Sequence, residues 1–171
     1  MVGRINWQYF PKTDRIPNHM LEIVRIFEKN RSSIDSSAKK LVSNDVLSII
    51  HKDLEALGFK VETGKKTGEK NRVPVLFGKN GLVEKSFDAD AHNVKTGTVV
   101  EVEAGRGVTN YQFLKDLFQA CVMYDVKYLA IAIRNTYRGR KDFDIVISFF
   151  EAFYASGRLK LPLEGVLIIG Y

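Results

Sequence analysis

The order of apolar and polar residues along this chain follows two periods, one helical and one strand-like. Apolar residues recur every three to four positions in four segments, which predicts helices over 17–30, 44–57, 109–124 and 143–155. The second of these begins at a capping residue, Ser43 or Asn44, and ends at Gly58, a residue type that commonly terminates helices. Four amphipathic helices are therefore expected.

Strand-like segments lie between the expected helices and cover 73–78, 87–91, 99–103, 127–134 and 165–171. Tyr128–Ile133 is apolar throughout, as in a strand covered on both faces, and its place after a helix indicates a crossover connection. We expect an α/β fold with a central mixed sheet of four to five strands flanked by helices. Residues 1–171 would form a single domain, with a core over about 44–134 and an N-terminal helical extension over 1–43.

Two of these strands carry acidic residues at alternate positions and are joined by a turn-like segment, His92–Gly97. The four acids are Asp88, Asp90, Glu101 and Glu103. Because successive strand side chains point to opposite faces, the members of each pair share a face. A hairpin centred after Lys95 places Asp90 opposite Glu101, and Asp88 opposite Glu103. Opposed like charges cost roughly 0.2–1 kcal/mol per pair, and a divalent cation such as Mg²⁺ relieves that repulsion.

The overall charge of the chain is opposite in sign to that of this acidic hairpin. Lys and Arg number 26 against 20 Asp and Glu, a net charge of +6, so the surface should attract polyanions unless it is simply a soluble basic surface. A nucleic-acid enzyme that uses a metal ion needs both basic surface and an acidic pocket. The single cysteine, Cys121, excludes an internal disulfide and a cysteine-based zinc site. With no long apolar run and no signal-peptide core, the chain is expected to be cytoplasmic.

Two polar segments are rich in cations and are expected to be exposed loops. Their candidate phosphate-contacting residues are Lys65, Lys66 and Lys70 in the first and Arg138, Arg140 and Lys141 in the second. Tyr137 is placed to stack on a base. For the first loop, a plain solvated linker explains the composition equally well.

The order of elements and the acids together resemble the restriction-endonuclease-like superfamily, named PD-(D/E)XK for its Asp followed by Asp/Glu-x-Lys. The likeness spans about 44–134, and ten residues separate Asp90 from Glu101, a spacing similar to that of the family. The family's first acid corresponds to Asp90, or alternatively Asp88, its second acid to Glu101, and its third position to Glu103. That third position is usually Lys, although some type II restriction enzymes have Glu or Gln there. The resemblance also implies an acid from the preceding helix, for which Glu55 is the candidate.

Phosphodiester hydrolysis assigns roles to these residues. Asp90 and Glu101 would hold Mg²⁺, for which Mn²⁺ can substitute, with the main-chain carbonyl of Val102, while Glu103 would orient water or hold a second ion. In the family, the lysine at the third position supplies the positive charge near the attacking water. Here Lys115 or Arg106 would supply that charge. Gln119 and Gln112 share one face of the helix that follows, either toward the site or as a solvated stripe.

We therefore expect the protein to be a Mg²⁺-dependent DNA endonuclease of restriction or repair type. Its expected partner is DNA, and a homodimer is one oligomeric state compatible with this function. Two alternatives stay open. The first is a catalytically inactive nucleic-acid-binding protein of the same fold, which Glu103 in place of Lys favours. The second is a Ca²⁺-binding structural hairpin without any nucleic-acid role.

Overall fold

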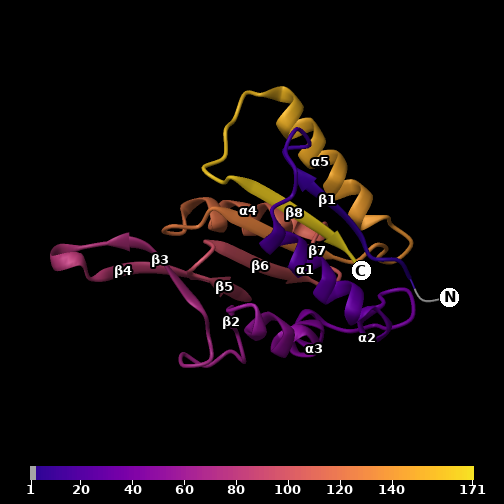
Figure 1. The fold of residues 1–171 in the computed structure, drawn as a ribbon, viewed down its shortest axis with the longest axis horizontal. Coiled ribbons are helices and arrows are strands. Elements are labelled where there is room, and N and C mark those ends of the chain that lie inside the picture. The colour runs from indigo at the N-terminus through magenta and orange to yellow at the C-terminus, as the bar shows by residue number, and fades with distance from the viewer. Residues whose placement is uncertain (1–2) are drawn as a thin grey trace.

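The computed structural model describes residues 3–171 and shows an α/β fold around one mixed six-stranded sheet (Figure 1). The strands, in their order across the sheet, are β1 (Asn6–Phe10), β8 (Gly165–Gly170), β7 (Tyr128–Ile133), β6 (Thr98–Glu103), β5 (Ala91–Asn93) and β2 (Lys60–Val61). Strands β6, β7 and β8 run parallel, and the other three pair antiparallel. The expected α/β class and mixed sheet are confirmed.

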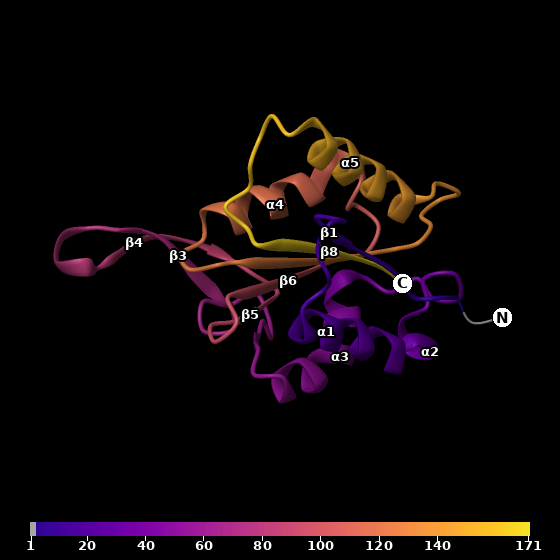
Figure 2. The ribbon, with the colours of Figure 1, turned by 45° about the horizontal axis from the view of Figure 1, so that its top comes forward.

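Helices cover both faces of the sheet (Figure 2). One face carries α1 (Asn18–Lys29), α2 (Arg31–Ile34) and α3 (Ser43–Ala56), and the other carries α4 (Gln112–Val122) and α5 (Asp142–Ser156). Alternate residues of the central strands point into the two hydrophobic cores, one on each face of the sheet. Val100 packs with the core beneath α1, α2 and α3, and Val99 packs with the core beneath α4 and α5. The four long helices lie within about three residues of the ranges that their apolar periodicity predicts.

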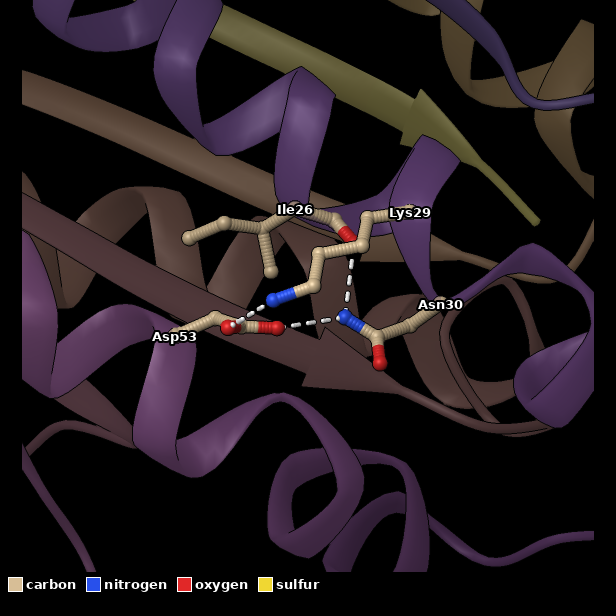
Figure 3. A network of polar contacts seen from close by, with 4 residues as sticks. All are labelled: Ile26, Lys29, Asn30 and Asp53. Atoms are coloured by element: carbon tan, nitrogen blue, oxygen red, sulfur yellow. Dashed lines mark hydrogen bonds and ion pairs between the residues drawn. The ribbon is translucent and has the colours of Figure 1, made fainter.

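A polar network joins the first two long helices at the end of α1 (Figure 3). The Lys29 ammonium lies 2.6 Å from one carboxylate oxygen of Asp53 on α3. The Asn30 amide donates to the other oxygen at 2.8 Å and to the carbonyl of Ile26 at 2.9 Å. These contacts join α3 to α1. At the start of α3, the Ser43 hydroxyl accepts a hydrogen bond from the Ala104 amide at 3.0 Å.

The sheet has more strands than expected because both of its edges were missed. Strand β1 lies in the segment for which we expected only helix, and it pairs with β8 from Asn6↔Gly170 to Phe10↔Val166. Strand β2 is only two residues long, and Lys60 and Val61 show no alternation that would reveal it. None of the helices within residues 3–171 is both long and apolar enough to cross a bilayer.

The acidic hairpin also differs from its expected form. Strands β3 (Arg72–Phe77) and β4 (Val83–Asp88) form a separate two-stranded arm, with a 3₁₀ turn η1 (Lys79–Gly81) at its tip. Asp88 ends β4 opposite Arg72, so the predicted pairing of Asp88 with Glu103 is wrong. The chain changes sheets at Ala89, whose amide donates to the Asn71 carbonyl at 2.9 Å. Pairing with β3 therefore takes Asp88 out of the hairpin formed by β5 and β6.

Candidate active site

Six acidic residues meet in one polar pocket of about 200 Å³ beside β6 and α4. They are Glu62, Asp88, Asp90, Glu101, Glu103 and Asp116. The pocket is completed by Ser43, Ala89, Val102, Gln112, Lys115 and Gln119. All the residues predicted from the hairpin and from the next helix, Lys115 and Gln119 included, thus lie together, joined by two acids that the sequence interpretation did not single out.

Strand β6 supplies the centre of the pocket. Its alternation turns Val100 and Val102 toward the α1–α3 layer, which leaves Glu101 and Glu103 on the face covered by α4. Glu101 is buried with 8% of its surface exposed, whereas Glu103 is partly exposed. The two glutamates consequently face the polar side chains of α4 rather than solvent.

Asp90 is held beside Glu101 by main-chain contacts. The Val102 amide donates to the Asp90 carboxylate at 2.7 Å, and the Asp90 carbonyl accepts from the Glu62 amide at 2.7 Å. Strand pairing reaches Ala91↔Val100, so the next position along the register sets Asp90 against Glu101, as the sequence predicts. The same contact brings Glu62, which follows β2, to the pocket.

Asp116 is the one acidic residue of α4, and it is buried, with 3% of its surface exposed. One carboxylate oxygen accepts a long hydrogen bond of 3.4 Å from Gln112, and the other has no hydrogen-bond partner among the described residues. Asp116 raises the pKa of Glu103, and Glu103 in turn lowers the pKa of Asp116, so the two carboxyls influence each other's protonation. The sequence does hold a signal for Asp116: it interrupts the apolar stripe Phe113, Leu117 and Ala120 at helical spacing.

Burial of this cluster disfavours its charged state. Burial, followed by the charges of Glu62 and Asp116, raises the pKa of Asp90 to about 7 despite the opposing Val102 amide. Burial and Asp116 raise the pKa of Glu103 to about 8, and burial raises the pKa of Asp116 to about 6. The pKa of Glu101 is also raised well above its ordinary value, first by burial and then by Asp90. A cation bound among these acids would favour their joint ionisation near neutral pH.

The donor set suits a hard divalent cation. Carboxylate oxygens are the preferred ligands of Mg²⁺, and the unpartnered Asp116 oxygen is a buried acceptor that lacks a positive partner. Within residues 3–171, no three acidic, histidine or cysteine side chains are already gathered around one point as metal ligands. Binding of an ion would therefore require these side chains to rotate toward it.

Three predicted acidic or basic candidates stand apart from the centre of the pocket. Asp88 lines its edge but forms an ion pair with Lys70, and Arg72 lies 3.9 Å away. Glu55 lies outside the pocket on α3 and contacts His51 at 3.1 Å. Arg106 is exposed and does not line the pocket. Of the two candidate first acids, Asp90 is therefore better placed than Asp88.

Some cations of the two predicted DNA-contacting loops are exposed, and others form ion pairs with acidic residues. Lys65, Lys66, Arg138 and Lys141 are exposed. Arg140 instead donates to the buried Asp142 at 2.6 Å and to Thr109 at 3.0 Å, and Lys70 is held by Asp88. The Tyr137 ring lies 5.3 Å from the Arg138 guanidinium and equally far from that of Arg134, so stacking on a base would have to displace these cations.

Comparisons of the chain with protein-family models, with curated proteins and with solved structures give no match.

Proposed function

We propose that this protein is a Mg²⁺-dependent DNA endonuclease of the restriction-endonuclease-like superfamily, of restriction or repair type. The observation that carries the proposal is the convergence of Asp90, Glu101, Glu103 and Asp116 with Lys115 on one pocket. The order of a helix, a strand pair, a Glu-x-Glu strand, a helix and a parallel strand supports it. So does the net charge of +6, because a basic surface favours association with phosphates.

Asp90 and Glu101 would hold the ion, together with the main-chain carbonyl of Val102. When bound, Mg²⁺ or Mn²⁺ lowers the pKa of water and neutralises charge that develops on the phosphate. The side chains of Glu103 and Asp116 would handle the proton of the attacking water. Burial raises the pKa of Glu103 to about 8, so only its ionised form, which a bound cation would favour, would accept a proton from the attacking water. Asp116 lines the same pocket and raises the pKa of Glu103, so it would favour uptake of the proton by Glu103.

Lys115 would replace the lysine that the family usually carries at the third position. Lys115 is exposed and lines the pocket, and its charge lowers the pKa of Asp90, Glu103 and Asp116. An ammonium group at this place stabilises negative charge on a phosphate in the transition state. The cation thus comes from α4 rather than from β6.

Incubation of plasmid DNA with the protein and Mg²⁺ or Mn²⁺ tests the proposal. We expect cleavage that EDTA abolishes, and a loss of about a hundredfold or more in Glu101→Gln, which keeps the shape of the side chain but removes a ligand charge. Glu28→Gln, an exposed substitution on α1, is the matched control and should cleave like the parent. Cleavage that persists in EDTA, or that is equal in the two variants, would contradict the assignment.

The inactive DNA-binding protein stays as the second candidate, because Glu103 stands where the family has its lysine. That protein would bind DNA with strong salt dependence but would not cut it under any metal condition. Absence of cleavage by the parent with retained DNA binding would select it.

A further inference from the structure

The β3–β4 arm extends away from the body of the molecule (Figures 1 and 2) and carries an exposed apolar tip. The exposed fractions are 69% for Leu82, 56% for Leu76, 53% for Val83 and 46% for Phe77. Large apolar side chains that gather at one exposed place commonly mark a contact site. The mechanism proposed above uses none of these residues.

The arm is anchored at its root. Val73 is buried in the core beside α4, and the Pro74 carbonyl accepts a hydrogen bond from the Tyr124 amide at 2.8 Å. Nearer the tip, the Phe77 ring meets the Tyr124 ring edge to face, with centroids 5.0 Å apart, so Phe77 belongs to the anchor. The free apolar side chains are those of Leu76, Leu82 and Val83. Because an isolated two-stranded hairpin is only marginally stable, this anchoring is what allows the arm to hold its tip away from the body.

The arm and the loop before it carry an excess of positive charge, which favours a polyanion. Residues 65–85 contain six cations and two acids; the cations are Lys65, Lys66, Lys70, Arg72, Lys79 and Lys85. Two of them, Lys79 and Lys85, flank the apolar tip and are exposed. The arm also ends at the candidate active site, since Asp88, the last residue of β4, lines the pocket. A polymer of phosphates lying across the pocket would therefore meet the arm.

We propose that the β3–β4 arm is a DNA wedge: Leu82 and its apolar neighbours enter a groove and insert at a base step, while Lys79 and Lys85 bind the flanking phosphates. Apolar side chains that enter the minor groove and unstack bases act in this way in other DNA-binding proteins. The inference rests on the proposed DNA-directed function and specifies how the duplex is held. A second copy of this chain fits less well, because it would bring like charges together at the tip.

The test compares Leu82→Ser with Leu159→Ser, a matched leucine of 65% exposure in the loop after α5. Binding to short duplex DNA is measured by fluorescence anisotropy in EDTA, where no cleavage occurs, at several salt concentrations. The same duplexes carry 2-aminopurine at successive positions, and its fluorescence rises when a base is unstacked. Circular dichroism checks that both variants fold, and light scattering reports their mass.

We expect Leu82→Ser to bind about tenfold more weakly, to lose the 2-aminopurine signal, and to keep the parent's salt dependence because no cation is removed. Leu159→Ser should match the parent in all three. Parent-like binding and fluorescence in Leu82→Ser would overturn the wedge while leaving the nuclease proposal to its own cleavage assay. A parent dimer that Leu82→Ser converts to monomer, with DNA binding unchanged, would overturn the wedge in favour of a second copy. A parent that neither binds nor cuts DNA would overturn the proposed function and the wedge with it.

Discussion

Neighbouring acids and cations of this chain acquire different roles from their individual contacts. Asp88 and Asp90 are two positions apart, yet Asp88 is neutralised by Lys70 and Asp90 accepts the Val102 amide inside the pocket. Arg140 and Lys141 are adjacent, yet Arg140 pairs with Asp142, which is fully buried, and Lys141 is exposed. The contacts of each charged residue, and not its position in the sequence alone, thus determine its role.

Arg140→Ala should lower stability rather than act only on DNA binding. It leaves the buried Asp142 carboxylate without its guanidinium partner, and because Arg140 itself is partly exposed we expect a loss of roughly 1–3 kcal/mol in the free energy of unfolding. Lys141→Ala should leave stability unchanged and weaken DNA binding. Urea denaturation of both variants measures the difference, and equal stability would show that the pair contributes nothing.

At the scale of elements, the pocket depends on how α3 ends. The Gly58 amide donates to the Glu55 carbonyl at 2.8 Å, and the Phe59 amide reaches the Leu54 carbonyl at 3.1 Å, as in a Schellman-type helix end. Gly58 adopts φ +88°, in the left-handed region. This turn directs the chain into β2 and so brings Glu62 to the pocket.

Gly58→Ala should therefore destabilise the protein by about 1–2 kcal/mol, because an L side chain is strained at this φ. The added Cβ would lie 3.5 Å from the Asn93 amide nitrogen, an ordinary contact, so the strain is in the backbone alone. Gly68→Ala, whose Cβ would meet nothing within 4 Å, is the control and should be neutral or slightly stabilising. Chemical denaturation that ranks the two variants the other way would contradict this account of the turn.

At the scale of the whole molecule, a basic protein encloses an acidic pocket, so its stability should depend on pH and on metal together. The carboxyls of Asp90, Glu103 and Asp116 have pKa values raised to about 7, 8 and 6 in the folded protein. They bind more protons folded than unfolded once the pH exceeds about 4, their ordinary pKa. Their stabilising contribution is complete below that pH and is lost as the pH rises through the folded values.

We expect the metal-free protein to lose on the order of a few kcal/mol of stability as the pH rises to about 8. The fall should be clearest above about pH 6.5, because His19 and His92, whose pKa values burial lowers, oppose it only below that point. Mg²⁺ should restore part of the loss, and Glu103→Gln should flatten the pH dependence. Thermal unfolding in EDTA and in Mg²⁺ across this range measures both, and a stability that rises above pH 6.5 without metal would contradict the cluster's raised pKa values.

The sequence by itself determined the α/β class, the four long helices, the apolar β7 and the pairing that brings Asp90 to Glu101. These depend on local period and on a short hairpin turn, and local spacing is visible in a linear chain. It also identified Asp90, Glu101, Glu103 and Lys115 as one group, since they lie on consecutive elements.

Only the tertiary structure decided what depends on distant pairing. Strand β1 joins the sheet through β8, which is more than 150 residues away, and β2 is too short to show a period. Glu62 and Asp116 reach the pocket because β2 pairs with β5 and α4 packs against β6. Asp88 is paired with Lys70, 18 residues away, because β3 and β4 fold against each other. The contact of Arg140 with Asp142 is local, but the hydrophobic pattern does not show it because both residues are charged.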